Sequence, residues 1–163
     1  MAHDLTQLAR LHAAHVDTQN QLCARALAAH GFDALVIHSG TPVSKCLVDD
    51  QSWPLRPTPL WLQFAPLFEA GCALVIAPGK KPRMLRAREL NVWEAPPPPE
   101  SDHFWAAFDV TEIGPEHLKS ELPQGRVAFV GDDLAAASKW GIPAVNPPEL
   151  MKALDQLRVH KTA

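Results

Sequence analysis

A short apolar run, Ala34-Leu35-Val36-Ile37, limits the possible folds of this chain more strongly than any other segment. It closes on His38, and Ser39-Gly40 then interrupts the apolar pattern. An acidic pair, Asp49-Asp50, follows before Trp53-Pro54. A Val/Ile-rich run without alternation is typical of a strand that is buried on both faces of a sheet. The sequence therefore predicts a buried strand over residues 34–38 that leads into an acidic loop.

The segment before this strand carries the clearest helical pattern. Apolar residues recur at steps of three and four from Leu5 to Leu27, Asp4 has the form of an N-cap, and Gly31 supplies a stop. We expect one helix over residues 5–29, packed on the sheet.

Histidines and cysteines are the residues to consider first for a metal site. His12 and His15 lie three residues apart, but two imidazoles with no carboxylate or third histidine nearby are more typical of packing or surface residues. Cys23, Cys46 and Cys72 are widely spaced and odd in number. This pattern predicts three buried free thiols in a reducing compartment, and no metal site.

The rest of the chain mixes strand and helix patterns. Residues 60–64 alternate like a strand, and residues 72–77 and 82–88 read as a hairpin with one solvent-facing member. Further strands are expected at 108–113 and 127–130.

Short helices are expected between these strands and after them. One begins at Gly114-Pro115, a second follows Asp132 or Asp133 as N-cap and runs to Trp140, and a third starts from Asn146 as N-cap. The count of about six strands and four helices predicts a single α/β domain with a mixed sheet flanked by helices.

Composition excludes several classes of function. The chain is 47% hydrophobic and 20% charged, with a net charge of −3, which is typical of a globular protein with no nucleic-acid partner. No apolar run approaches the ~20 residues that cross a membrane, and the first residues do not form a secretory signal. We expect a cytoplasmic protein.

Taken together, five pieces resemble the N-terminal domain of bacterial prolidases, the Xaa-Pro dipeptidases of the creatinase/aminopeptidase P superfamily. The matching pieces are LARLHAAHVDTQNQLCARAL, ALVIHSG, LVDDQSWPLRP, FWAAFDVTEI and LRVHKTA. The resemblance implies a six-stranded mixed sheet flanked by helices. It also implies a non-catalytic domain over residues 1–157, followed at 158–163 by the start of a connection to a C-terminal metallopeptidase domain.

The chemistry implied by the resemblance resides in that following domain. There, two divalent cations, commonly manganese, are held by two Asp, one His and two Glu and activate a water that attacks the bond before proline. None of these ligands can be placed in this sequence, so we expect no catalytic residue here and no hydrolysis by this chain alone.

The resemblance also implies a homodimer in which the small domain of one subunit lies near the active site of the other. It implies that Asp50 binds the free ammonium of a dipeptide substrate, with Asp49, His38 and Trp53 as further candidates. From the residues alone, Asp49 and Asp50 more often cap a turn, His38 is more often structural, and Trp53 more often fills the core.

The resemblance has departures and rivals. Relatives usually carry aromatic residues where this chain has Ser52-Trp53 and Leu55, and the four-proline run at 96–99 is distinctive. One rival function is a free-standing module that binds a small metabolite at the carboxyl ends of its strands. Another is the N-terminal domain of an aminopeptidase P or a creatinase.

Overall fold

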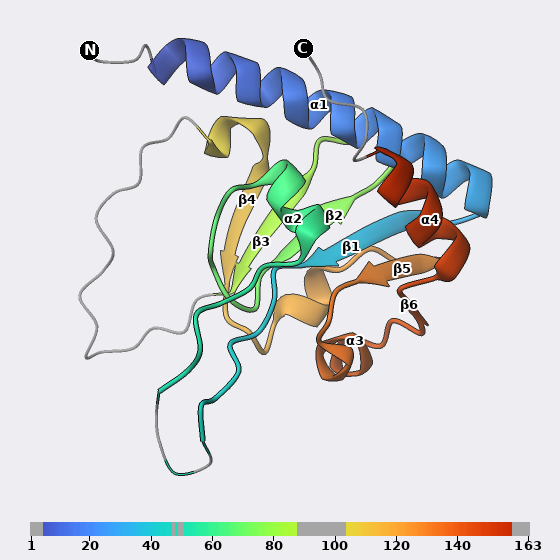
Figure 1. Cartoon of the computed structure of the whole chain (residues 1–163). Coiled ribbons are helices and arrows are strands. Elements are labelled where there is room, and N and C mark those ends of the chain that lie inside the picture. The colour runs from blue at the N-terminus through green and yellow to red at the C-terminus, as the bar shows by residue number, and fades with distance from the viewer. Residues whose placement is uncertain (1–4, 47, 49–50, 88–103, 158–163) are drawn as a thin grey trace.

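The computed structural model describes residues 5–46, 48, 51–87 and 104–157. A six-stranded mixed sheet with strand order β4-β3-β2-β1-β5-β6 forms the centre of the domain, and helices cover both of its faces (Figure 1). The strands are β1 (Ala34–His38), β2 (Ala73–Ile76), β3 (Arg83–Ala87), β4 (Asp109–Ile113), β5 (Val127–Val130) and β6 (Ala144–Val145). The helices are α1 (Leu5–His30), α2 (Pro59–Phe64), α3 (Leu134–Trp140) and α4 (Pro148–Leu157), with 3₁₀ turns η1 (Trp105–Ala107) and η2 (Leu118–Glu121).

The central strand is β1, as its composition predicts. It pairs antiparallel with β2 and parallel with β5, and all five of its residues are buried. The pairs β2–β3, β3–β4 and β5–β6 complete the sheet, so that within the described residues only β2 runs against the other strands. The predicted mixed sheet is therefore confirmed.

Alternate residues of the strands face two separate apolar layers. Leu35 and Ile37 of β1 lie in the layer that α1, α2 and α4 cover. Ala34 and Val36 lie in the opposite layer, which α3 and η2 cover. Because side chains alternate along a strand, each face of β1 supplies one of the two cores.

The strand predicted over residues 60–64 is wrong, because this segment forms helix α2. Pro59 occupies the first turn, where its fixed φ suits a helix, and Leu60, Trp61 and Phe64 share one buried face. Leu62 is 40% exposed, which contradicts the face that alternation requires. The sixth strand is instead the two-residue β6.

The hairpin of β2 and β3 is confirmed, but its second strand is not solvent-facing. β3 lies between β2 and β4, and its central residues Met84, Leu85 and Arg86 are buried. The Arg86 guanidinium pairs with both carboxylate oxygens of Glu69 and stacks on the Trp105 ring at 4.2 Å. A paired and stacked guanidinium can occupy an interior position that the sequence pattern assigns to solvent.

Helix α1 confirms the predicted helix within one residue at its C-terminus, whereas the N-cap predicted at Asp4 lies outside the described residues. His12 and His15 of α1 contact α2. The Nε2 atoms of His12 and His15 lie 2.8 Å from the main-chain oxygens of Phe64 and Gln63. A carbonyl oxygen only accepts, so each imidazole donates its Nε2–H to the end of α2.

Of the two helix N-caps predicted in the C-terminal half of the chain, one is confirmed and the other is wrong. Asp133 caps α3 as predicted, because its Oδ1 accepts from the Ala136 N–H at 2.8 Å. Asn146 does not cap α4. Its amide instead pairs with both main-chain groups of Gly131, at 3.0 and 2.9 Å. The helix predicted after Gly114-Pro115 is the short 3₁₀ turn η2.

The three cysteines are free, but only two are buried. Burial raises the pKa of the Cys23 thiol to about 12 and that of Cys72 to about 11. Cys46 is exposed, so its predicted burial is wrong. It belongs to the long loop that follows β1, where no core is available to cover it.

Candidate functional site

The arm, defined as residues 41–57, begins just after the central strand ends. The chain leaves β1 at His38, passes through Ser39-Gly40, extends away from the sheet and returns at Thr58 to α2 (Figure 1). Most described side chains of the arm are exposed. The arm therefore reaches beyond the body of the domain from an origin at the centre of the sheet.

Main-chain hydrogen bonds fix the root of the arm. The Ser39 N–H donates to the Cys72 carbonyl, and the Cys72 N–H donates to Ser39 Oγ, each at 2.9 Å. The Thr58 N–H donates to the Ser39 carbonyl at 3.2 Å, and the Gly71 N–H donates to the Gly40 carbonyl at 2.9 Å. Both ends of the arm are thus held to each other and to the start of β2.

Gly40 is the point at which only glycine fits. Its φ of +118° lies in a region that residues with a side chain rarely adopt. A Cβ atom there would lie 3.1 Å from the Arg56 carbonyl oxygen and 3.3 Å from Leu55 Cδ1. The outgoing and returning limbs of the arm can therefore pass this closely only over a glycine.

A hydrogen bond joins the first residue of the arm to α3. Thr41 Oγ1 donates to Asp133 Oδ2 at 2.6 Å, while Asp133 Oδ1 accepts from the Ala136 N–H. The hydrogen bond from Thr41 and then that from Ala136 hold the pKa of Asp133 below its ordinary value. One carboxylate thereby caps the helix and orients the arm.

The two limbs of the arm lie antiparallel and expose apolar side chains. Contacts between their described residues include Lys45 N–H to the Gln51 carbonyl (2.9 Å), Lys45 Nζ to Gln51 Oε1 (3.0 Å), Trp53 N–H to the Val43 carbonyl (2.8 Å) and an isolated bridge between Ser44 and Ser52. Val43, Val48 and Trp53 are 68%, 97% and 59% exposed. The prediction that Trp53 fills the core is therefore wrong. The Lys45 ammonium lies over the Trp53 ring, 5.6 Å from its centre.

The acidic pair Asp49-Asp50 lies outside the described residues, between Val48 and Gln51 in the sequence.

His38 is an interior residue. It is 1% exposed and faces the α3 layer, with its ring stacked near Phe129 (5.9 Å) and edge-on to Trp140 (5.3 Å). Its Nδ1 has no hydrogen-bond partner among the described residues. Burial lowers the pKa of His38, and the negative charges of Asp133 and Asp132 oppose that shift.

Of the predicted site residues, the structure thus describes two and does not bring them together. His38 lies inside the domain beneath α3, and Trp53 lies on the outside of the arm. The root of the arm is shaped by Gly40, Thr41 and Asp133, none of which the sequence pattern marks as a site residue. Gly40 was visible as a break after a strand, whereas 92 residues separate Thr41 from Asp133 and no local pattern links them.

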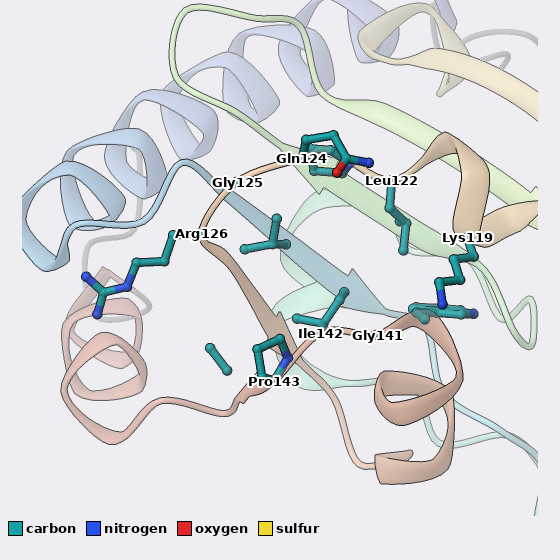
Figure 2. Close-up of a pocket in the computed structure, with 12 residues that line it drawn as sticks. Lys119, Leu122, Gln124, Gly125, Arg126, Gly141, Ile142 and Pro143 are labelled. Atoms are coloured by element: carbon teal, nitrogen blue, oxygen red, sulfur yellow. The ribbon is translucent and has the colours of Figure 1, made fainter.

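A cavity lies at the amino end of β5, away from the arm. It measures about 510 Å³, and Figure 2 shows Lys119 and Arg126 on opposite sides of it, with Leu122, Ile142 and Pro143 between them. The Arg126 guanidinium lies 4.8 Å from the centre of the Phe32 ring. Among the described residues, no carboxylate or histidine lines this cavity, so they offer no acid–base pair there.

The described residues bring no three His, Cys, Asp or Glu side chains together as a metal site. None of the helices in the described ranges is both long enough and apolar enough to cross a membrane.

Comparison with known proteins places this geometry in a family. A model of the Xaa-Pro dipeptidase N-terminal domain matches residues 10–156. The Xaa-Pro dipeptidase of Pseudoalteromonas atlantica is 28% identical over 162 residues, which cover 97% of this chain and 36% of that protein. The Xaa-Pro dipeptidase of Shewanella pealeana is 31% identical, over 97% of this chain and 37% of that protein. The chain thus spans a little over a third of the length of these relatives.

Solved structures support the fold. An aminopeptidase P from Escherichia coli matches with a TM-score of 0.51 and 16% identity, over 90% of this chain and 33% of that chain. The proline aminopeptidase P II of Yersinia pestis gives a TM-score of 0.50 and 13% identity over the same shares. The six-stranded sheet with flanking helices is common to these proteins, and the family match covers the strands, α2 and the arm. The chain belongs to the family of Xaa-Pro dipeptidase N-terminal domains.

Proposed function

We propose that this chain is the non-catalytic N-terminal domain of a Xaa-Pro dipeptidase, a metallopeptidase that cleaves dipeptides ending in proline. In this proposal the enzyme is a cytoplasmic homodimer, and the arm of one subunit caps the active site of the other. The catalytic domain of the same chain and the dipeptide substrate are the remaining partners.

The observation that carries the proposal is the arm itself. It projects from a root fixed by hydrogen bonds, yet exposes Val43, Val48 and Trp53 to solvent. Exposed apolar groups gathered on a projecting segment mark a surface that another protein surface covers. Burial of apolar area contributes roughly 25 cal/mol per Å², so three such side chains favour association. Trp53 in this position would form part of the wall of the capped site.

The acidic pair would supply specificity in this arrangement. A dipeptide carries its free ammonium one residue from the bond that is cleaved, and a carboxylate at a fixed distance selects that length. A longer peptide would collide with the arm or leave the carboxylate without a partner. We assign this role to Asp50. In the competing interpretation, Asp49 and Asp50 only cap a turn. His38 is buried beneath α3, which favours a structural role for it.

The two divalent cations, manganese in this proposal, would be held outside this domain. The described residues offer no three clustered ligands, so no step of the hydrolysis is assigned to this chain. Incubation of the pure 163-residue chain with Mn²⁺ and Leu-Pro is expected to give no proline. Measurable turnover would contradict a non-catalytic role.

The test of the arm is steady-state kinetics of the complete dipeptidase. Asp50→Asn should raise the KM for Leu-Pro about tenfold or more, the loss expected for one charge-assisted hydrogen bond, and should relax the exclusion of tripeptides. Asp17→Asn is the matched control, because Asp17 is an exposed carboxylate on α1 that, within the described residues, accepts a hydrogen bond from Gln21 alone. Unchanged kinetics for both substrates in Asp50→Asn would remove the arm from the active site.

The alternative within the superfamily is an aminopeptidase P-like enzyme, with which the chain shares the fold at 13–16% identity. Preference for peptides longer than two residues in the same assay would favour that alternative.

A further inference from the structure

A second cavity lies on the α3 side of the sheet, at the carboxyl ends of β1 and β5. It measures about 280 Å³, and its lining includes His38 from β1, Thr41 from the root of the arm, and Asp133, Lys139 and Trp140 from α3 and its N-cap. Trp140 also lines the cavity of Figure 2, whereas His38, Thr41, Asp133 and Lys139 do not.

The topology of the sheet favours a ligand at this point. β1 and β5 are parallel neighbours, yet the chain leaves β1 toward β2 on one side and leaves β5 toward β6 on the other. In open α/β sheets, the connections of two such strands diverge and leave a crevice at their carboxyl ends, where ligands bind.

His38 contributes a buried imidazole to the wall of the cavity. It is 1% exposed, and its Nδ1 makes no hydrogen bond with any described residue and is closed to solvent. The ring nitrogens of His38 therefore sense a charge placed in the cavity without bonding the ligand through Nδ1.

The charges around the cavity select a ligand with two opposite charges. Asp133 lines the cavity, and Asp132 is close enough to act on His38, so this side attracts a cation. The Asp133 carboxylate accepts from Thr41 and Ala136 and still has lone pairs for a further donor. Lys139 lies almost two turns of α3 away and would oppose a simple amine, whereas it would pair with a carboxylate on the same molecule.

The remaining walls are apolar and limit the size of the ligand. The lining is completed by apolar residues, namely Gly71, Pro115, Leu118, Ala135, Ala136 and the Trp140 ring. The volume lies just below the roughly 300–1,000 Å³ of pockets for drug-sized molecules, so the ligand is smaller than these.

We propose that this cavity binds a small zwitterion with an apolar side chain, namely a free α-amino acid or a dipeptide. The ammonium contacts Asp133 beside the His38 ring, the carboxylate contacts Lys139, and the apolar carbons contact Leu118 and Trp140. This site is independent of the proposed function, because it needs neither the arm tip nor a catalytic domain.

The test is isothermal titration of the 163-residue chain with four probes: leucine, glycyl-leucine, 3-methylbutylamine and 4-methylpentanoate. The last two are leucine without its carboxylate and without its ammonium. Leucine or glycyl-leucine should bind saturably and about tenfold or more tightly than either singly charged analogue, since each analogue lacks one charge-assisted contact. Tighter binding of leucine would indicate an amino-acid site, and tighter binding of glycyl-leucine a dipeptide site. Heteronuclear NMR should show the His38 ring nitrogen resonances moving with the same saturation curve.

Two variants locate the binding. Lys139→Ala should reduce the affinity for leucine to that for the amine, because Lys139 is exposed and its removal leaves the fold intact. Lys119→Ala, at the cavity of Figure 2, should leave the affinity for leucine unchanged. Absence of saturable binding by both zwitterions, equal binding of leucine and the amine, or unchanged leucine binding in Lys139→Ala would each overturn the proposal.

Discussion

Replacement of Gly40 by alanine tests whether the root of the arm is as tightly determined as its geometry indicates. At φ +118°, a residue with a side chain is strained by about 1–3 kcal/mol. The new Cβ would also lie 3.1 Å from the Arg56 carbonyl oxygen and 3.3 Å from Leu55 Cδ1, and this crowding adds about 1–3 kcal/mol. The lower entropy of the unfolded alanine chain offsets about 0.4–1 kcal/mol. Together these terms give a net loss of unfolding free energy of about 1–5 kcal/mol, centred on ~3 kcal/mol.

The matched control is Gly79→Ala. Gly79 also has a positive φ, +72°, but a Cβ there meets no atom within 4 Å. It therefore carries the backbone strain alone, about 1 kcal/mol. Urea unfolding followed by circular dichroism gives both values. If Gly40→Ala destabilises the chain no more than Gly79→Ala does, the close passage of the two limbs over Gly40 is refuted.

Three further measurements examine other features of the domain. In the native chain, a thiol reagent should label Cys46 alone of the three cysteines, because the other two are buried and their pKa values are raised. All three cysteines should react in denaturant. Fast labelling of a second thiol in the native chain would contradict this burial. Stability supplied by neutral His38 is complete above its ordinary pKa of about 6.5 and is lost as the pH falls from there through its lowered folded-state pKa, since the unfolded chain then binds the proton more readily. His38→Gln should therefore flatten the decline in unfolding free energy between about pH 7 and pH 5, and an unchanged slope would argue against the buried neutral imidazole. Asn146→Ala should lower the unfolding free energy by about 2–3 kcal/mol, because it removes both hydrogen bonds to Gly131 and keeps a side chain at φ +43°. Asn146→Gly loses only the hydrogen bonds and should therefore lower it by about 1 kcal/mol less. Equal losses in the two variants would refute the contribution of the backbone conformation.

Most of the sheet could be predicted from the sequence because buried strands and a long amphipathic helix leave direct patterns. The apolar run at 34–38 and the three- and four-residue steps of α1 correspond closely to observed elements. Residues 60–64 form a helix although their pattern predicts a strand, because five residues can satisfy both the alternation of a strand and a short helical face. The tertiary burial of Trp61 decides in favour of the helix. β6 could not be foreseen, since a two-residue strand has no period of its own.

The candidate site was less predictable than the fold. Its position after β1 follows from the break at Ser39-Gly40, but its orientation depends on the contact between Thr41 and Asp133, which only the folded topology brings together. The burial of Arg86 likewise depends on Glu69, 17 residues away. Such pairings are properties of the assembled sheet and leave no local signal.

The contact between α1 and α2 has a consequence for how the arm is anchored. The returning limb of the arm leads into α2, whose final carbonyls accept Nε2–H groups from His12 and His15. The last carbonyls of a helix have no partner within it, so the long helix α1 supplies the donors that the six-residue helix α2 lacks at its C-terminus. The outgoing end of the arm is bonded instead to the N-cap of α3 through Thr41. The arm is thus anchored to the helical layers on both faces of the sheet, and a shift of either layer would be transmitted to it.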